Sequence, residues 1–349
     1  MSEGGRVTFR GAIEPIGSVA LFFAQKRCPM RVLSMFDGIS CGRVALERVG
    51  ITPEVYYASE VDPHAERVSA DNYPDIIRLG DAFGVESWDI WNIDLLLGGS
   101  PCTHWSIAQK DNRETESSGI GWELFSLYAK AIEVFHPRYF LYENVRSMSS
   151  QIRGEITRIL GVEPININSA LVSAQTRNRL YWTNIPGVQQ PEDKKISLCS
   201  ILEPGGIAYR EKAECIRATY YKCGGINARN FEKKITDGLG YDGVLIRAEE
   251  CSGPLFAGKT PYTVRDGEIE IHGSKYKMPA PDGLYYLRKY TVNEACRLQT
   301  LPDNYCRAVS DTQAYKGIGN GWTIDVIAHI LTGLATSATG VPYVERRSA

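Results

Sequence analysis

The chain has 349 residues, 43% of them hydrophobic, with 39 Lys and Arg against 41 Asp and Glu and a formal net charge of −2. This composition is typical of a globular protein with one large domain and a smaller one, and it excludes fibrous and disordered classes. No run of about 18 apolar residues occurs, so we expect no membrane span. Because the net charge is slightly negative, a polyanionic partner would have to be bound by local basic patches.

Nine cysteines are scattered without a CxxC pair, at positions 28, 41, 102, 199, 215, 223, 251, 296 and 306. An odd number without paired spacing indicates a reducing compartment and no disulfide framework. The same spacing predicts no metal site. Residues 1–30 are interpreted as a cytosolic extension, because their apolar stretch lacks the flanks of a signal peptide, and residues 336–349 as a C-terminal tail.

Alternating strand and helix patterns occupy residues 31–184. The run Arg31–Phe36 predicts a strand, and Val44–Val49 has helical spacing after a glycine turn. Further strands are expected over 55–59, 76–79, 94–100 and 138–142, with helices over 64–72 and 122–135. This order predicts a doubly wound α/β domain with a mostly parallel sheet, in which chemistry gathers at the carboxyl ends of the strands.

The pattern changes after Pro186. Glycines, tyrosines and short alternating runs dominate up to about residue 289, which predicts a separate, mostly β or irregular unit over residues 185–289. Helical spacing returns in Thr291–Leu298 and in Trp322–Leu334. Residues 290–335 are therefore expected to return to the first domain.

Small and acidic residues follow the first three predicted strands. Phe36–Gly42 lies between a strand and a helix, where small residues let a ligand approach the helix N-terminus. Glu60 and Asp81 close the next two strands, where carboxylates can accept hydrogen bonds from ribose hydroxyls and an adenine amino group. Together these positions indicate an adenosyl cofactor.

Pro101-Cys102 and Glu143-Asn144-Val145 follow the fourth and fifth predicted strands. A Cys thiolate is a soft nucleophile that can add to C6 of cytosine, and a carboxyl held against N3 can draw electron density through the ring. A Pro-Cys pair alone more often marks a turn followed by a buried thiol. The catalytic interpretation therefore depends on further motifs in the expected order.

Taken in order, these motifs resemble those of the cytosine-C5 DNA methyltransferase family over residues 31–335. Phe36–Gly42 looks like the family's methionine-binding loop, Gly98–Cys102 like its nucleophile motif, and 143–145 like its cytosine-binding motif. Residues 175–179 are similar to the QxRxR motif, 297–302 to the RLQ motif and 319–321 to the GN motif. The resemblance implies a Rossmann-like S-adenosylmethionine-dependent methyltransferase fold, with a target-recognition domain in residues 185–289.

The resemblance also implies three groups of site residues. The catalytic group is Cys102, Glu143, Asn144, Arg177 and Arg179, with the arginines on the base O2 or on flanking phosphates. The cofactor group is Phe36, Asp37, Gly38, Ile39, Ser40, Gly42, Glu60, Val61, Asp81, Ala82, Ser100, Pro101, Asn320, Gly321 and Trp322. The DNA group is Lys110, Arg113, Gln175, Arg217, Lys222 and Arg229. S-adenosyl-L-methionine is the implied cofactor and double-stranded DNA the implied partner, with no obligatory protein partner.

Ser100 departs from many bacterial members, which have a second proline there. The Ser-Pro-Cys form, together with Trp322, is similar to the animal de novo branch and to phage-encoded enzymes. The resemblance therefore implies a solitary or restriction–modification enzyme, located in the cytoplasm of a bacterial or phage-infected cell and associated with the nucleoid.

Two segments are expected at the DNA. The polar stretch Thr103–Gly121 is predicted to close over an extruded base, with residues 119–121 as its hinge, or else to be a solvated surface loop. Residues 209–234 carry seven Lys or Arg against three Glu, interleaved with tyrosines. Such a patch suits phosphates and base edges, although charge runs are more often solvated faces.

Two alternatives stay open from the sequence. The tRNA-methylating branch of the same fold has Phe-Thr shortly after the nucleophile, whereas this chain has Thr103-His104-Trp105. A catalytically silent accessory protein would lack nucleophile or cofactor residues that are present here. His104 is two residues from Cys102, and we expect it to be solvated and not catalytic.

Overall fold

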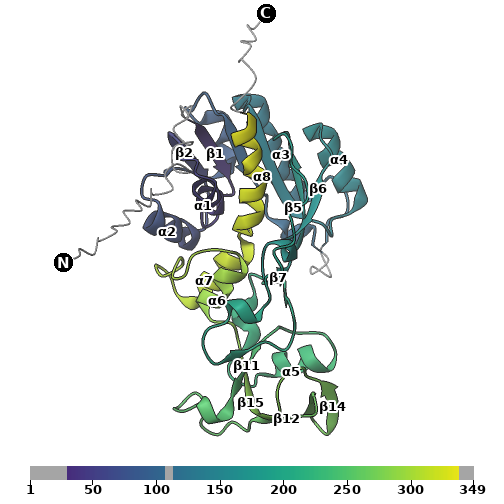
Figure 1. The fold of residues 1–349 in the computed structure, drawn as a ribbon. Coiled ribbons are helices and arrows are strands. Elements are labelled where there is room, and N and C mark those ends of the chain that lie inside the picture. The colour runs from purple at the N-terminus through teal and green to yellow at the C-terminus, as the bar shows by residue number, and fades with distance from the viewer. Residues whose placement is uncertain (1–29, 107–112, 338–349) are drawn as a thin grey trace, which may run out of the picture.

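The central element of the fold is a seven-stranded sheet in the order β3-β2-β1-β4-β5-β8-β6 (Figure 1). The computed structural model describes residues 30–106 and 113–337. The strands are β1 (Arg31–Met35), β2 (Val55–Ser59), β3 (Ile77–Gly80), β4 (Leu95–Gly98), β5 (Tyr139–Val145), β6 (Ile165–Asn168) and β8 (Asn178–Thr183). Strands β1 to β5 pair in parallel, and β8 is antiparallel to both of its neighbours. The predicted α/β fold with a mostly parallel sheet is confirmed.

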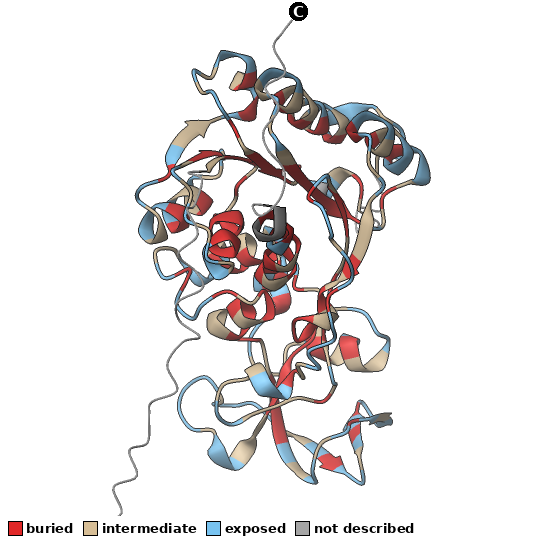
Figure 2. Ribbon diagram, turned by 45° about the horizontal axis from the view of Figure 1, so that its top comes forward, coloured by how far each residue is buried: buried red, intermediate tan, exposed pale blue. Residues whose placement is uncertain are grey.

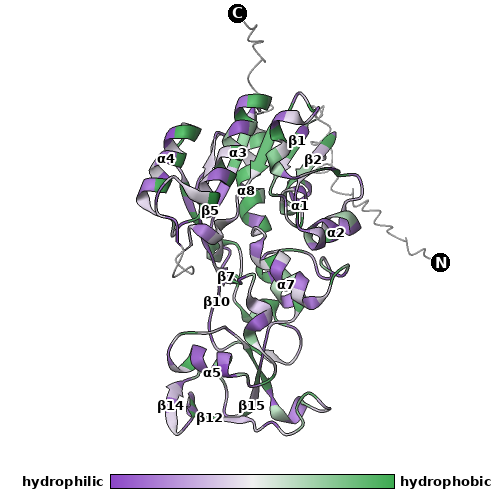
Figure 3. Cartoon of the chain, turned by 180° about the vertical axis from the view of Figure 1, so that it is seen from behind, coloured by the Kyte–Doolittle hydropathy of each residue, from purple (hydrophilic) through white to green (hydrophobic). Residues whose placement is uncertain are grey.

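Helices cover both faces of this sheet. On one face lie α1 (Cys41–Arg48), α2 (Pro63–Asn72) and α8 (Ile324–Ser337), and on the other α3 (Gly119–Phe135) and α4 (Ser150–Leu160). Successive residues of β1 point to opposite faces, so that Val32 joins the first core and Leu33 the second. Burial on both faces explains why the central strands β1 and β4 are mostly apolar, whereas the edge strand β3 has no buried residue (Figures 2 and 3).

A second sheet forms the lower part of the molecule in Figure 1 and lies within the residues expected to form the smaller unit. Its six strands pair antiparallel in the order β14-β13-β12-β15-β11-β9. They are β9 (Gly206–Ile207), β11 (Val244–Arg247), β12 (Tyr262–Arg265), β13 (Glu268–Ile271), β14 (Ser274–Lys277) and β15 (Gly283–Arg288). Helix α5 (Arg229–Thr236) packs on this unit through the buried Phe231 and the partly buried Ile235, and most of its other residues are hydrophilic (Figure 3).

A short parallel pair, β7 (Gln175–Thr176) with β10 (Ala213–Glu214), joins the two parts of the molecule. The remaining short elements are 3-10 helices: η1 (Ala82–Ser87), η2 (Cys102–His104), η3 (Ser169–Leu171), η4 (Cys199–Ile201), η5 (Tyr220–Cys223) and η6 (Ala248–Glu250). No helix in the described ranges has the length and apolar character needed to cross a bilayer.

The chain returns to the first domain through α6 (Val292–Leu298), α7 (Asp311–Asn320) and α8. Helix α6 lies within the helical spacing predicted over residues 291–298, and it begins with a capping box between Thr291 and Glu294. Helix α7 was not predicted, because Gly317 and Gly319 lower its intrinsic helix propensity. Its packing requires Gly319: a Cβ there would lie 2.2 Å from the backbone nitrogen of Ala218 in the second unit.

Replacing Gly319 by Ala is therefore expected to lower the free energy of unfolding by about 3 kcal/mol, because backbone atoms cannot yield as a side chain would. The matched control is Gly154→Ala in α4, where an added Cβ meets nothing within 4 Å. That change is expected to raise stability by about 0.5–1 kcal/mol through helix propensity. Urea unfolding of both variants checks the pair, and equal effects would contradict the packing argument.

Candidate functional site

The carboxyl ends of β1, β2, β4 and β5 meet at one edge of the sheet. The register pairs Met35 with Ser59, and Gly98 with Tyr142. The loop after β1 therefore lies beside Glu60, and the Ser100-Pro101-Cys102 turn lies beside Glu143. Motifs far apart in the sequence are thus brought to a single edge, as expected for ligand sites in parallel sheets.

The loop after β1 is a sharp turn held by Glu60. Phe36, Gly38 and Ser40 all have positive φ, at 56°, 58° and 61°. The Gly38 N–H donates to Glu60 Oε2 at 2.8 Å, and Glu60 Oε1 accepts from the N–H groups of Val61 and Asp62 at 2.9 and 2.8 Å. Glu60 therefore positions the loop, and its carboxylate faces the cavity described below.

Asp37 is buried beneath this loop. Its carboxylate accepts from Ser40 Oγ at 2.5 Å and from the Tyr56 hydroxyl at 2.8 Å. Burial raises the pKa of Asp37 from its ordinary 3.8 to about 6, against the opposing effect of its hydroxyl donors. The folded protein thus binds a proton here more tightly than the unfolded chain.

This shift predicts a pH dependence of stability. Between pH 4 and 6 the folded state holds more protons at Asp37, so the free energy of unfolding falls as pH rises and then levels off above the folded pKa of about 6. At about 1.4 kcal/mol per pH unit the contribution is about 3 kcal/mol. Asp37→Asn should flatten this part of a stability–pH profile measured by chemical unfolding, and an unchanged slope would contradict the assignment.

Glu143 is held between an arginine and a tryptophan. Its Oε1 lies 2.9 Å from Arg179 Nε, and its Oε2 accepts from Trp322 Nε1 at 3.0 Å. In the antiparallel pair of β5 and β8, Glu143 is opposite Tyr181, so Arg179 is a diagonal neighbour on the same face. The carboxyl group is therefore fixed in direction at the end of β5.

Asn144 lies behind the cavity and connects the two catalytic motifs. Its Nδ2 donates to the Ser100 carbonyl at 3.1 Å and to the Tyr142 hydroxyl at 3.2 Å, and that hydroxyl lies 2.6 Å from Ser100 Oγ. These bonds fix the backbone immediately before Pro101. Cys102 begins η2, and its neighbours Pro101 and Thr103 both line the cavity.

Two residues of the QxRxR motif point inward. Gln175 is fully buried, and its amide bonds to the Leu298 carbonyl, Gln299 Oε1 and the Ile216 N–H. The predicted DNA contact of Gln175 does not fit this geometry, because no polar atom of its amide is left facing solvent. Arg177 is also buried, and it donates to the carbonyls of Gly319 and Gly321, so that it supports the GN motif.

These elements enclose a cavity of about 450 Å³. Its lining includes most of the predicted catalytic and cofactor residues: Phe36, Asp37, Gly38, Ile39, Glu60, Ser100, Pro101, Glu143, Arg177, Arg179, Asn320, Gly321 and Trp322. The volume is in the range of nucleotide-sized sites. Glycine keeps its floor open, since a Cβ on Gly99 would lie 3.0 Å from the Glu143 carbonyl oxygen. The lining offers carboxylates that can accept hydrogen bonds and the aromatic rings of Phe36 and Trp322, which fits an adenosyl cofactor.

Five cofactor predictions fall outside this lining. Ser40 and Gly42 are buried beneath the loop, where Ser40 bonds to Asp37. Val61 is 66% exposed, and Asp81 caps η1 by accepting from the Phe83 N–H at 3.1 Å, with Ala82 buried behind it. The Asp81 carboxylate is thus used as a helix cap at the rim of the sheet, and its adenine contact stays a prediction.

The stretch after the nucleophile is held by Glu114. This side chain accepts from Trp105 Nε1 at 3.2 Å and from the Gly121 N–H at 3.1 Å, and His104 Nδ1 lies 3.3 Å from it. Residues 119–121, the predicted hinge, form the first turn of α3, and their role as a hinge stays a prediction. Lys110 lies outside the described residues.

The predicted basic patch is divided. Arg210, Lys212 and Lys234 bond to internal carboxylates or carbonyls. The predicted contacts Arg217, Lys222 and Arg229 are exposed, and Arg217 stacks 4.4 Å over the Tyr241 ring. Arg113, in contrast, donates to the carbonyls of Trp105 and Ser147 and braces the loop against the end of β5.

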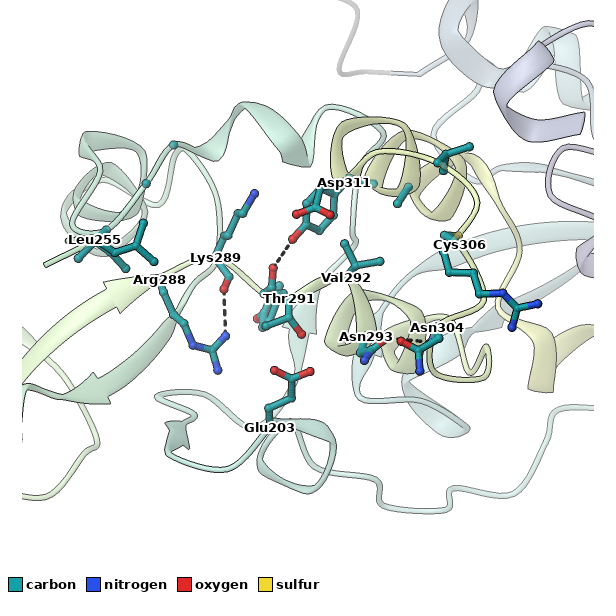
Figure 4. A pocket seen from close by; sticks show the side chains of 18 residues that line it. Glu203, Leu255, Arg288, Lys289, Thr291, Val292, Asn293, Asn304, Cys306 and Asp311 are labelled. Carbon is teal, nitrogen blue, oxygen red and sulfur yellow. Dashed lines mark hydrogen bonds between the residues drawn. The ribbon is translucent and has the colours of Figure 1, made fainter. Parts of the chain in front are cut away.

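Helix α7 contributes residues that the sequence did not single out. Lys316, Gln313 and Gly317 line the cavity, and Lys316 Nζ lies 2.7 Å from Asp62 Oδ2. In the sequence these residues have the spacing of one helix face, and this pattern, although interrupted by glycines, is the signal by which they could have been found. The opposite face of α7 borders a second cavity of about 540 Å³, lined by Asp311, Lys289 and the α6 start (Figure 4). None of the predicted site residues is among its described lining.

The comparisons with known proteins agree with this arrangement. A family model described as C-5 cytosine-specific DNA methylase matches residues 30–162 and 166–335. The chain is 28% identical over 336 residues to the type II methyltransferase M1.ScrFI of Lactococcus lactis subsp. cremoris, covering 90% of this chain and 80% of that protein. It is 26% identical over 362 residues to the type II methyltransferase M.HpaII of Haemophilus parainfluenzae, covering 90% and 92%. The fold is similar to that of the Entamoeba histolytica methyltransferase EhMeth, with a TM-score of 0.58, 15% identity, and 90% and 100% of the two chains covered.

Proposed function

The chain belongs to the C-5 cytosine-specific DNA methylase family, and from that premise we propose that it methylates C5 of a cytosine in duplex DNA. The cytosine would be extruded into the 450 Å³ cavity, with Cys102 and Glu143 as the catalytic residues. The predicted family and its enzymatic activity, DNA cytosine-C5 methylation, are confirmed, and the RNA-methylating and catalytically silent alternatives are not favoured. The observation that carries the proposal is the register of β4 and β5, which places the Cys102 turn beside Glu143.

The chemistry follows from the electronic character of the ring. Cytosine C5 is a weak nucleophile, so the Cys102 thiolate first adds to C6, and the electron pair moves toward N3. Glu143, held by Arg179 and Trp322, would act in its protonated form, in which its carboxyl O–H donates to N3 and stabilises this charge. C5 would then form the new bond to the methyl carbon as the bond from that carbon to the sulfonium sulfur breaks, with the electron pair of the broken bond staying on sulfur. Loss of the C5 proton to a base and departure of the Cys102 thiolate restore the aromatic ring.

S-adenosyl-L-methionine is the cofactor that this cavity fits, and when bound it supplies an electrophilic methyl group on a sulfonium. The residues proposed to hold it are the Phe36–Ile39 loop, Glu60 for the ribose, and Asn320 to Trp322 from the end of α7. Because Trp322 also donates to Glu143, the cofactor side and the base side of the cavity share a wall.

The base must leave the helix to reach this site, since its C6 is inaccessible within a stacked duplex. We propose that the exposed Arg217, Lys222 and Arg229 contact DNA from residues 185–289, the proposed target-recognition unit. Replacing residues 185–289 by the corresponding segment of M.HpaII is expected to change the DNA sequence that is methylated, because base readout would come from this unit. An unchanged target would place recognition elsewhere.

The test of the function is transfer of labelled methyl from S-adenosylmethionine to unmethylated duplex DNA, followed by bisulfite sequencing. We expect label at cytosines in one sequence context. Label on tRNA in place of DNA, or on neither, would overturn the proposal. Binding of S-adenosylmethionine to the protein in the absence of DNA, measured by calorimetry in the same preparation, shows that the protein used is folded.

A further inference from the structure

Cys215 lies next to the two arginines of the QxRxR motif. The parallel pair of β7 and β10 aligns Ala213 with Gln175 and Glu214 with Thr176, so the next residues along the strands are Cys215 and Arg177. The Ile216 N–H donates to Gln175 Oε1 at 3.1 Å, which holds the segment just after Cys215. A residue from the second unit is thereby placed against the catalytic edge of the first.

The sulfur of Cys215 contacts both guanidinium groups. Its Sγ lies 3.1 Å from Arg177 Nη1 and 3.9 Å from Arg179 Nη2. Arg179 also directs its Nε to Glu143 and its Nη1 to the Asn178 carbonyl at 2.9 Å. Cys215 and Glu143 therefore contact the same guanidinium through different nitrogens, and together they fix its plane.

The charges around the thiol favour its anionic form. Burial by itself raises the pKa of the Cys215 thiol, but the guanidinium groups of Arg177 and Arg179 outweigh burial and lower it. The further charged group of this cluster is Glu143, which reaches Cys215 only through Arg179. A Cys215 thiolate therefore compensates the positive charge of Arg177 and Arg179. Without it, Glu143 would be the one anion of this cluster to do so.

We propose that Cys215 is a positioning residue for methyl transfer, whose sulfur holds the side chains of Arg177 and Arg179 so that Arg179 stays on Glu143. This inference rests on the proposed roles of Glu143 and Arg179. It assigns Cys215 no contact with the base, and it is independent of the Cys102 nucleophile. Through Arg179 it also connects the second unit, which contains β10, to the catalytic carboxylate.

The first test is single-turnover methyl transfer by the full chain at saturating cofactor and DNA. Cys215→Ala is expected to lower this rate about 10- to 100-fold, since a small displacement of a catalytic group has effects of that size. Cofactor affinity should stay within about twofold, because the loop after β1 is held by other contacts. Cys215→Asp, which restores an anion, should recover most of the rate. The matched control Cys199→Ser changes an exposed cysteine outside the cavity and should leave the rate unchanged.

The second readout is pH dependence. The wild-type rate divided by the Cys215→Ser rate should rise with pH as the thiol ionises and then level off, because serine stays neutral. Both proteins keep Cys102, Glu143 and the two arginines, so the ratio reports the change at position 215. A ratio that is flat with pH, or a Cys215→Ala rate equal to that of wild type, would overturn the positioning role.

A third readout does not require activity. In the Cys102→Ser variant, alkylation of Cys215 by iodoacetamide can be followed across pH by mass spectrometry, with Cys199 as the reference thiol. The midpoint for Cys215 is expected below that of an ordinary thiol, about 8.5. A midpoint at or above that value would overturn the proposal even if the enzyme is active. Failure of the proposed function, in contrast, would appear as methyl transfer that survives Cys102→Ser.

Discussion

Replacing Cys102 by Ser is expected to lower methyl transfer by about a thousandfold or more, while cofactor and DNA binding stay within a few fold of wild type. A serine hydroxyl ionises far less readily than a thiol, so almost no nucleophile is present to add to C6. The substitution leaves unchanged the hydrogen bond from Asn144 to the Ser100 carbonyl, which fixes the backbone just before this position. The measurement is single-turnover transfer of labelled methyl, with binding measured by calorimetry and fluorescence anisotropy.

A trapping experiment gives the same prediction a covalent readout. In duplex DNA that carries fluorine at the target C5, fluorine cannot leave as a cation, so the Cys102 adduct cannot collapse after methyl transfer. Wild-type protein should form a complex that survives denaturing electrophoresis, and Cys102→Ser should form none. Cys199→Ser, the exposed-cysteine control, should behave as wild type. Unchanged turnover of Cys102→Ser would sink the mechanism.

Glu143→Gln is expected to slow methyl transfer by about 10²- to 10⁴-fold, with only a modest loss of DNA affinity. Glutamine keeps an oxygen that can accept from Trp322 Nε1, but it loses the ion pair with Arg179 and the ability to hold a proton at N3. The effect should appear in the rate at saturating substrate and not in the Michaelis constant, because the stabilised charge develops only after attack on C6.

The matched control for Glu143→Gln is Glu123→Gln, which makes the same chemical change on the exposed surface of α3. It should leave both rate and affinity within twofold of wild type. If Glu143→Gln lowered only DNA affinity, the carboxyl would be assigned to structure and not to the reaction. The combination of Glu143→Gln with Cys215→Ala should cost less than the product of the two separate effects, since both act through Arg179.

The first five strands of the sheet and the motifs at their ends could be predicted from the sequence because their signals are local. Apolar runs such as residues 95–97 and 139–142 predict buried strands, and the polar residues that follow them lie at the edge of the sheet. Parallel strands align their carboxyl ends, so the proximity of the Cys102 turn to Glu143 followed from the fold class alone.

Side-chain roles within the QxRxR motif could not be predicted in the same way. The motif predicted a DNA contact for Gln175 and catalytic roles for Arg177 and Arg179. In the structure, Gln175 and Arg177 bond inward, while Arg179 reaches Glu143. The direction in which each side chain of the motif points depends on how β8 pairs with β5 and how β7 pairs with β10. A shift of one residue in either register would exchange inward and outward side chains.

By itself the sequence determined the order of the first five strands, the strand-end motifs and the family, since periodicity and short motifs are encoded within a few neighbouring residues. Only the tertiary structure decided that α7 forms despite its glycines, that the predicted hinge is a helix start, and that Cys215 lies on Arg177, 38 residues away in the chain. These features come from packing and backbone pairing between distant segments, whose free energy depends on the whole fold and leaves no local pattern.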